Sequence, residues 1–492
     1  MKNFEQNKLP KNWILTTLGT IGIVVSGGTP STDDPEFWGD EIPWLTPADL
    51  SNYENVYISK GNRNITKVGL EYSSARLLPK NSILYSSRAP IGYVAIAKNE
   101  LATNQGFKNL IVNDKFINPK YVYYYLKTTK ELAENMASGT TFLEISASKF
   151  KEIPFPLAPI AEQNIIVEKI EELFSELDKS NNYLLRSKQQ LENLNQLLIY
   201  NSFKNINNIV KLKDISEIHM GQSPDSKTYN KEKVGLPFLQ GKKEFTEMYP
   251  IIEKWTTNPI RIANQNDILM SVRAPVGDVN IANINCCIGR GLASIRFIGY
   301  NKFLFYYLKS IKQEIRELGT GTTFSAISRE IISNLNVPLL DLLLQKNLID
   351  ELELKLNNNE KNIEDINQLI EKNEILKKKI LLEAFCGKLM LRLPAYSSSD
   401  FLLEQIIENK ALWVDEKNKI DKNKPKFART KINLLLFIDK KFNKYSFTYL
   451  ELLKSIKMSH EQLAKEFDIL LRDNNIEKYF DNETLTIKYK LK

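Results

Sequence analysis

Two long segments of the chain carry apolar residues at heptad spacing, which is typical of helices that pair along a seam. No proline or glycine interrupts the first segment, 160–203. We predict a single helix of about 44 residues there, roughly 66 Å long at 1.5 Å per residue. Its predicted seam is apolar except for two serines: Ile166, Ile170, Leu173, Leu177, Ser180, Leu184, Ser187, Leu191, Leu194 and Leu198.

The second segment, 341–385, has a less regular seam in which two asparagines lie among the apolar residues. Asparagines at seam positions fix register or partner at a cost in stability, and the alternative is that Asn359 and Asn373 face solvent. We predict that the two helices pair antiparallel with each other; a separate dimerisation zipper for each is the alternative. The apolar seam positions are Leu352, Leu356, Ile363, Ile366, Ile370, Leu376 and Ile380.

The other segments show short β-rich runs, such as "IGIVV", "SILYSS" and "DILMSV", between turns rich in Gly, Pro and Asn. One helix is predicted near the end of each segment, at 118–138 and 301–319. The first helix carries Tyr121, Tyr124 and Tyr125, which we interpret as core packing rather than as a stacking platform. The pattern predicts mixed α and β units.

These two β-rich segments are copies of one another. Asn81–Ala97 and Asn266–Ala282 are identical at 11 of 17 positions, including "RAP" followed two residues later by Gly. Leu18–Ser31 matches Leu212–Asp225 at an offset of 194 residues, and the "YYLK" and "GTTF" blocks match at an offset of 182. Insertions and deletions between matched blocks are expected in surface loops.

The fold class is therefore predicted as α+β, with two duplicated units, an antiparallel helical spacer and a small C-terminal α+β domain. The tail begins after the break "LPAYSSSD" and contains a predicted helix starting near Asp400, a charged linker at 415–431 and a strand-like end. We interpret the tail as a small module resembling a winged helix. The predicted boundaries are 1–155, 156–205, 206–338, 339–390 and 391–492.

Composition narrows the possible functions. There are 67 Lys+Arg against 59 Asp+Glu, a net charge of +8 that is compatible with a polyanionic partner. Three cysteines and two histidines form no disulfide framework and no metal-site spacing. No apolar run is long enough for a membrane span or a leader, so we expect a cytoplasmic location. Neither a methyltransferase NPPY-type tetrapeptide nor a G-x-x-x-x-G-K-[ST] loop occurs, and we expect no catalysis by the chain alone.

Several blocks in a fixed order resemble the specificity subunits of type I restriction-modification systems. They are "LPKNWILTTLGTIGIVVSGGTPS", "IPWLTPADL", "SSRAPIGYVAIA", "TNQGFKNL", "SGTTFLEIS", "IPFPLAPIAEQ" and "LLEAFCGKL", within residues 9–390. The resemblance implies that each unit is a target recognition domain reading half of a split sequence in double-stranded DNA. It further implies that the helices set the gap and dock two methyltransferase (modification) subunits, which motor-nuclease (restriction) subunits join. S-adenosylmethionine, ATP and Mg would then be held by those partners, with no cofactor on this chain.

Turns that occur in both copies are candidates for positioning the DNA backbone. Arg88 and Arg273, in the two "RAP" turns, suit a phosphate or a guanine edge, and structural pairing is the alternative role. Hydroxyls and amides in two glycine-rich turns are candidates for phosphate contacts, the alternative being tight turns alone. The threonines of the "GTTF" turns are candidate hydrogen-bond donors to DNA near the end of a helix. These candidates are Gly28, Thr29, Ser31, Gln222, Ser223, Thr140, Thr141, Thr322 and Thr323.

Residues that differ between the copies are better candidates for reading sequence, because two different half-sites need different contacts. Gln suits adenine, and Lys or Arg suits guanine, at roughly 1–3 kcal/mol for each good bidentate contact. The candidates are Trp44, Thr46, Asp49, Gln105 and Lys108 in the first copy and Gln240, Lys242, Lys243 and Arg290 in the second.

The sequence therefore predicts a non-catalytic DNA specificity subunit. Two alternatives remain at this point. One is a specificity subunit of a different restriction arrangement, and the other is a coiled-coil DNA-binding scaffold or regulator without methyltransferase partners. For the tail, contact with DNA, contact with the modification subunit and regulation all remain open.

Overall fold

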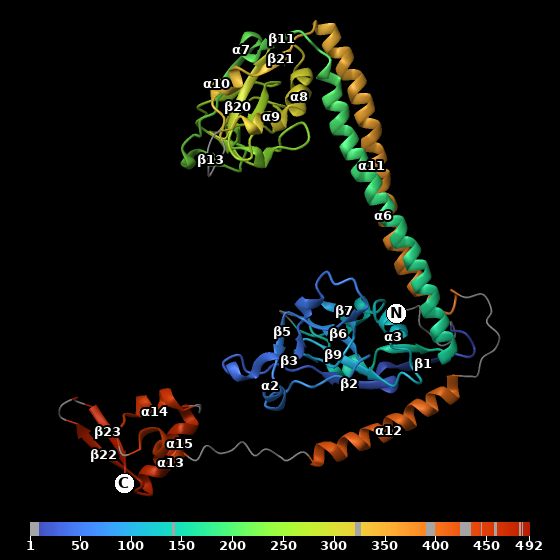
Figure 1. Ribbon diagram of the computed structural model, residues 1–492, viewed down its shortest axis with the longest axis vertical. Coiled ribbons are helices and arrows are strands. Elements are labelled where there is room, and N and C mark those ends of the chain that lie inside the picture. Colours follow the sequence, from blue (N-terminus) through green and yellow to red (C-terminus); the bar gives the residue numbers. More distant parts are fainter. Residues whose placement is uncertain are drawn as a thin grey trace. The chain divides into compact units, whose positions relative to one another are not determined.

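The computed structural model describes residues 9–139, 143–319, 326–389, 399–423, 434–443, 445–456, 460–481, 484 and 486–492. The chain divides into two compact units, 1–403 and 404–492. The larger unit contains both predicted copies and both long helices, which are labelled in Figure 1.

The first globular copy is built on a five-stranded sheet of order β2-β9-β6-β7-β4, beside a three-stranded sheet of order β5-β3-β8. A further antiparallel pair joins β1 near the start of the chain to β10 at the exit of the copy. The strands are β1 (Ile14–Thr17), β2 (Gly22–Ser26), β3 (Trp38–Leu45), β4 (Tyr57–Ile58), β5 (Arg63–Ile65), β6 (Ile83–Ser87), β7 (Ile91–Ala97), β8 (Ala102–Thr103), β9 (Lys108–Val112) and β10 (Pro154–Leu157). The helices are α1 (Leu18–Ile21), α2 (Lys67–Glu71), α3 (Pro119–Leu126), α4 (Lys130–Met136) and α5 (Ala147–Lys151), with 3-10 turns at Pro35–Phe37 and Pro47–Leu50.

The second copy repeats this plan. Its sheets have the orders β12-β20-β17-β18 and β13-β15-β14-β19-β16, and β11 pairs with β21 as β1 pairs with β10. The strands are β11 (Ile209–Lys211), β12 (Ser216–Met220), β13 (Tyr229–Asn230), β14 (Leu236–Leu239), β15 (Trp255–Thr256), β16 (Ile262–Ala263), β17 (Ile268–Ser271), β18 (Val279–Ile281), β19 (Cys286–Ile288), β20 (Leu292–Phe297) and β21 (Asn336–Pro338). The helices are α7 (Leu212–Ile215), α8 (Asn301–Ser310), α9 (Lys312–Glu317) and α10 (Arg329–Ser333), with 3-10 turns at Ser226–Thr228 and Lys242–Glu244.

Backbone hydrogen bonds between equivalent residues confirm the duplication. Ile145 donates its amide to the Ser87 carbonyl at 3.0 Å, as Ile327 does to Val272 at 3.1 Å. Each helix predicted near the end of a copy is divided into two pieces, α3 and α4 or α8 and α9. The predicted core role of the tyrosine run is confirmed, since Tyr121, Tyr124 and Tyr125 are all buried.

The two long helices, α6 (Ile160–Lys204) and α11 (Leu342–Phe385), lie side by side and run antiparallel (Figure 1). Three contacts fix the direction, because residue numbers on one helix rise as their partners' numbers fall. Asp178 pairs with Lys377 at 2.7 Å, Lys188 donates to Asn367 at 3.0 Å, and Asn359 donates to Asn195 at 2.8 Å. The predicted antiparallel pairing within one chain is therefore confirmed.

The seam differs in part from the predicted one. Asn373 donates to Asn181 at 2.7 Å, as Asn359 does to Asn195, so both seam asparagines face the partner helix rather than solvent. On α6 the predicted seam positions Ser180, Ser187 and Leu194 are exposed, although the Ser180 hydroxyl accepts from Asn373 at 3.5 Å. The residues that follow them, Asn181, Lys188 and Asn195, bond to α11. On α11 the predicted Leu376 is exposed and its neighbour Lys377 lies on the seam.

A buried glutamine joins each copy to the start of one long helix. The Gln163 side chain accepts from the amide of Asn118 at 2.9 Å and donates to the carbonyl of Ala158 at 2.8 Å. Gln345 repeats both bonds in the second copy, with the Tyr300 amide and the Leu340 carbonyl, each at 2.8 Å. These amides satisfy backbone groups that would otherwise be buried without partners.

The end of each long helix packs on the opposite copy. Phe385, at the end of α11, contacts Tyr121 and Tyr125 of the first copy at ring-centroid distances of 5.0 and 5.2 Å. Phe203, near the end of α6, contacts Phe303 and Tyr307 of the second copy at 5.3 and 5.5 Å. Each copy is thus held by the start of one helix and the end of the other.

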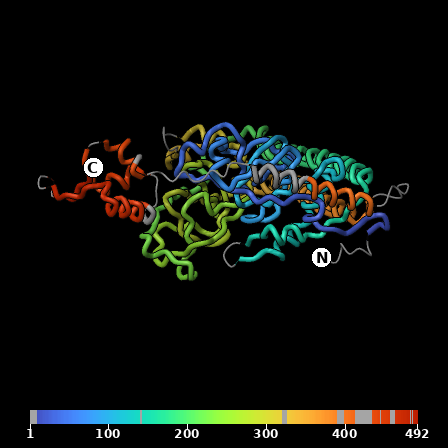
Figure 2. The backbone as a smooth tube through the Cα atoms, turned by 90° about the horizontal axis from the view of Figure 1, so that it is seen from below, coloured from blue at the N-terminus to red at the C-terminus, as the bar shows by residue number. Residues whose placement is uncertain are grey.

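The C-terminal residues, red in Figure 2, form a second compact unit. Helix α12 (Ser399–Asn423) spans the boundary between the units and includes part of the stretch predicted as a charged linker, so that prediction was wrong up to Asn423. The remaining elements are α13 (Leu434–Phe442), α14 (Tyr449–Ser455), α15 (His460–Arg472), β22 (Ile476–Asp481) and β23 (Thr486–Leu491). Phe447, between α13 and α14, bridges to Tyr489 of β23, so the unit is a small α+β domain, and its likeness to a winged helix stays a prediction.

Among the described residues, none of the helices combines the length and the hydropathy that a membrane span requires. The same residues contain no group of three or more His, Cys, Asp or Glu side chains that could hold a metal ion.

Candidate nucleic-acid interface

The two "RAP" turns have the same backbone and different surroundings. Both Ala–Pro bonds in these turns are cis. In the first copy, Glu144 lies 3.6 Å from the guanidinium of Arg88 and 3.0 Å from the amino group of Lys108. Lys108 is also held by the Ser87 hydroxyl at 3.2 Å, and its side chain is only 8% exposed. The predicted reader Lys108 therefore lies under the turn, where Glu144 neutralises it.

In the second copy, Arg273 forms the same backbone bridge to Ala326 that Arg88 forms to Glu144. Arg273 is exposed, and among the described residues no carboxylate lies within ion-pair distance of it. Ala293 occupies the place of Lys108 in the matching strand. The second turn therefore presents an arginine without the neighbouring carboxylate.

The glycine-rich turn of the first copy is tightly packed. Gly28 is buried, and a Cβ atom there would lie 2.2 Å from the backbone of Ser74. Its amide donates to Thr103 at 2.8 Å, and its carbonyl accepts from the Trp44 indole at 2.9 Å. Ser31 is exposed and caps the amide of Asp33 at 3.3 Å. These bonds make Gly28 the structural centre of the turn.

In each copy the glycine-rich turn meets a residue predicted to read sequence. The Thr29 hydroxyl donates to the side chain of Gln105 in the first copy. In the second, the Ser223 hydroxyl accepts from the amide of Arg290 at 3.2 Å. Gln105, Gln222 and Arg290 are exposed. The structure thus brings together predicted residues that lie more than 60 positions apart.

Three predicted reading residues of the first copy take part in internal contacts. Trp44 is 3% exposed, and its ring lies edge-on to Trp38 at 5.1 Å. Asp49 accepts from the amide and hydroxyl of Thr46, at 2.7 and 2.8 Å, in a capping box. Its other oxygen accepts from the backbone and side chain of Asn62, at 2.9 and 2.8 Å. A base contact by any of these side chains stays a prediction.

The corresponding loop of the second copy is cationic. Gln240, Lys242 and Lys243 line a pocket of about 500 Å³ together with Lys254 and the Ala274–Pro275 turn. Gln240 is exposed, and the Lys243 side chain is 81% exposed with Glu253 at 3.7 Å. The structure therefore places these three predicted residues beside the turn that carries Arg273.

Asp278 anchors Lys242, one of the residues that line this pocket. Lys242 pairs with its carboxylate at 2.7 Å, and Lys312 bonds to the other oxygen. Burial acts to raise the pKa of Asp278, but the hydrogen bonds from the two lysines outweigh it and hold that pKa below its usual value.

The predicted set and the structural candidates differ at several residues. Thr140, Thr141, Thr322 and Thr323 lie outside the described residues. Glu144, Lys254 and Asp278 were missed, although a difference between the copies, Glu144 against Ala326 at an offset of 182, is visible in the sequence.

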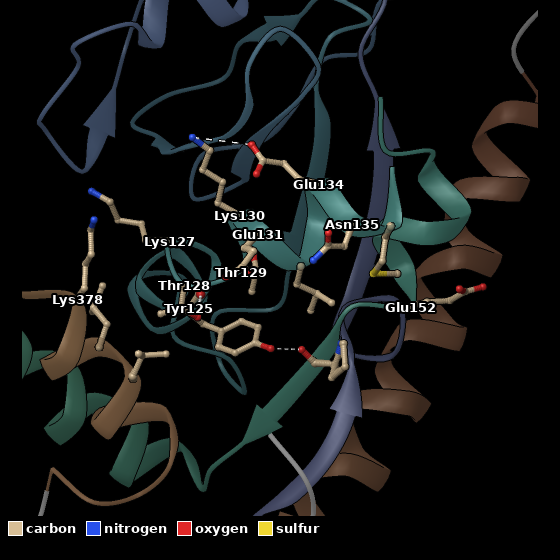
Figure 3. Close-up of a pocket in the computed structure, with 15 residues that line it drawn as sticks. Tyr125, Lys127, Thr128, Thr129, Lys130, Glu131, Glu134, Asn135, Glu152 and Lys378 are labelled. Atoms are coloured by element: carbon tan, nitrogen blue, oxygen red, sulfur yellow. Dashed lines mark hydrogen bonds and ion pairs between the residues drawn. The ribbon is translucent and has the colours of Figure 1, made fainter. Parts of the chain in front are cut away.

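A second type of hollow lies beside each copy. The larger, about 840 Å³, lies between the α3–α4 region and α11, where Lys127 and Lys378 extend to the same side (Figure 3). The equivalent hollow, about 440 Å³, is lined by Lys309 and Gln196 at the matching positions. Both hollows are formed where a globular copy meets a long helix.

These features define a class of protein in which two related recognition units share one antiparallel helical spacer. A family described as "Type I restriction modification DNA specificity domain" matches residues 10–187 and again residues 206–384. The chain belongs to this family of type I restriction-modification specificity subunits. The predicted family and fold class are confirmed.

Similar proteins agree with this assignment. The chain is 31% identical over 440 residues to a protein of Methanocaldococcus jannaschii described as "Putative type I restriction enzyme MjaX specificity subunit", covering 80% of this chain and 97% of that one. It is 37% identical over 262 residues to the MjaIX specificity subunit of the same organism, of which it spans 60%. A solved structure described in terms of assembly and conformational transition of the type I R-M system has a TM-score of 0.63 at 26% identity, over 77% of this chain and 99% of that chain. The HsdS subunit of Thermoanaerobacter tengcongensis has a TM-score of 0.52 at 25% identity.

Proposed function

We propose that the two copies read the two halves of a split DNA target, each copy using its own loops. The observation that carries this proposal is the contrast between a common frame and different exposed loops. The frame includes equivalent hydrogen bonds in both copies, whereas Thr46 and Asp49 on one copy are replaced by Gln240 and Lys243 on the other. Common contacts can position the DNA backbone, and only different contacts can specify different bases.

The charges of the two copies support unequal contributions to binding of the DNA backbone. Residues 1–155 contain 17 Lys+Arg and 15 Asp+Glu, whereas residues 206–338 contain 17 Lys+Arg and 12 Asp+Glu. A more cationic surface gains more from counterion release when it binds DNA. We therefore assign the larger share of the contacts with DNA phosphates to the second copy.

The helical pair would set the gap between the half-sites. Two modules on one face of a duplex must lie about one helical turn apart, roughly 34 Å, or a multiple of it. A pair of packed helices sets that separation before binding, so little entropy is lost in ordering it.

Two modification subunits would dock on the spacer, one near each copy. The repeated hollows beside α11 and α6 support this arrangement, because a duplicated surface suits two copies of one partner (Figure 3). Restriction subunits would join the assembly, and S-adenosylmethionine, ATP and Mg would be held by these partner subunits. The chain itself would supply recognition without catalysis.

The test is genome-wide methylation mapping at single-base resolution. Cells express the modification subunit encoded beside this chain, either with the chain or without it. A third culture expresses that subunit with a chain whose residues 1–155 are exchanged for those of another specificity subunit. We expect one split motif that appears only with the chain, and a change in one half-site only after the exchange. Absence of chain-dependent methylation, with both subunits soluble and expressed, would instead favour a DNA-binding scaffold or regulator.

A further inference from the structure

The two "RAP" arginines, Arg88 and Arg273, stand in equivalent backbone positions with different acidic neighbours. Glu144 bridges Arg88 and Lys108 in the first copy, at 3.6 and 3.0 Å. The equivalent of Glu144 in the second copy is Ala326, which pairs with Arg273 through the backbone alone. The two substitutions occur together, since the strand position of Lys108 is also an alanine in the second copy.

The surface charge of the two turns therefore differs even though the net charge does not. In the first copy, Arg88 and Glu144 are both about one third exposed and neutralise one another, while Lys108 is buried. In the second copy, Arg273 is exposed, and no carboxylate of the described residues forms an ion pair with it. A DNA phosphate approaching Arg88 meets the Glu144 carboxylate, whereas one approaching Arg273 meets no such repulsion.

We propose that Glu144 is a positioning residue that keeps Arg88 from contacting DNA phosphate. Of the two arginines, only Arg273 then contacts the DNA backbone. This inference rests on the proposed function, because it assumes that DNA passes the two turns. It assigns different roles to two arginines that the sequence alone makes equivalent. The Lys108–Glu144 pair has no counterpart at the matching positions of the second turn, which carry Ala293 and Ala326.

A purely structural role for Glu144 gives a different expectation. A buried lysine needs a carboxylate partner, and Glu144 would then serve Lys108 alone. In that case Arg88 would contact phosphate as readily as Arg273 does. The two possibilities separate in the salt dependence of DNA binding, whose slope falls by about 0.9 for each phosphate that the protein no longer neutralises.

The experiment measures Kd of the full chain, in complex with its modification subunit, by fluorescence anisotropy between 50 and 200 mM KCl. The probe is a labelled duplex carrying the motif found by methylation mapping. We expect Arg273→Gln to reduce the slope of log K against log salt by about 0.9. Arg88→Gln should leave that slope unchanged. Equal losses for the two variants would overturn the proposal.

A double substitution that gives the first turn the residues of the second tests the role of Glu144 directly. Lys108→Ala with Glu144→Ala copies the second turn, keeps the net charge and avoids leaving a buried lysine unpaired. We expect the slope to steepen by about 0.9, equivalent to a three- to four-fold greater loss of affinity between 50 and 200 mM salt. Adding Arg88→Gln to this variant should restore the wild-type slope. An unchanged slope in the double variant would contradict the proposal that Glu144 keeps Arg88 from DNA phosphate.

The reciprocal variant, Ala326→Glu, adds a carboxylate at an exposed position beside Arg273 and should reduce the slope as Arg273→Gln does. Its matched control is Ile298→Glu, which adds the same charge at an 83% exposed position beyond the far end of β20. An equal effect of both variants would refute the local mechanism. If the wild-type complex fails to bind the duplex at all, the proposed function itself fails, whatever the variants do.

Discussion

Replacing Phe385 with alanine tests how the first globular copy is attached to the spacer. The Phe385 side chain is fully buried and packs its ring against Tyr121 and Tyr125 at 5.0 and 5.2 Å. Truncating a fully buried phenylalanine costs about 3–5 kcal/mol, which includes the transfer of the ring, the cavity left behind and the removal of its edge-to-face packing. We expect this destabilisation to appear as local opening of the end of α11 and of α3.

Hydrogen exchange measured by mass spectrometry resolves such local opening. At about 1.4 kcal/mol per factor of ten, the change should speed exchange in α3 and the last turns of α11 at least 100-fold. The matched control is Phe203→Ala, which should speed exchange in α8 and at the end of α6 instead. The reasoning is refuted if Phe385→Ala leaves α3 as protected as in the wild type, or if both variants affect the same peptides.

Three further predictions concern the spacer and the second copy. Asn359→Leu should lower Tm, because it leaves Asn195 without its partner across the seam, and adding Asn195→Leu should recover the loss. Burial raises the pKa of Cys286 to about 12, so a thiol reagent at pH 8 should modify the half-buried Cys386 first and reach Cys286 only on unfolding. The pKa of Asp278 is held below its usual value, so the ionised carboxylate adds to the free energy of unfolding above about pH 4, and this stabilisation is lost as pH falls through the lowered pKa. Asp278→Asn should therefore flatten the acid-induced loss of stability measured by urea denaturation.

The long helices and their antiparallel pairing could be predicted from heptad spacing. The spacing did not identify every residue of α6 that faces α11. Leu194 is 42% exposed while Asn195 faces α11. An apolar pattern assigns leucine to the seam wherever it can, because burial of apolar surface is the usual driving force. Asn195 is preferred here because its amide has a matching amide at Asn359, and that match becomes visible only when both helices are placed.

The candidate interface was predictable as a set of loops and much less so residue by residue. Comparison of the two copies identified Gln240 and Lys243, which the structure leaves exposed in one pocket. It also selected Asp49, whose two oxygens are occupied by Thr46 and Asn62. Whether a polar side chain is free depends on partners far along the chain, and a loop sequence carries no signal for them.

The exchange of helix ends between the copies explains how duplicated units can diverge without losing their spacing. Gln163 and Phe385 hold the first copy, and Gln345 and Phe203 hold the second. These four side chains lie on the helices or at their junctions, away from the loops that carry the reading candidates. Substitutions in a loop such as 240–243 therefore change the surface offered to DNA without loosening the attachment. Such a separation between frame and loops allows one half-site to change while the other half-site and the gap stay fixed.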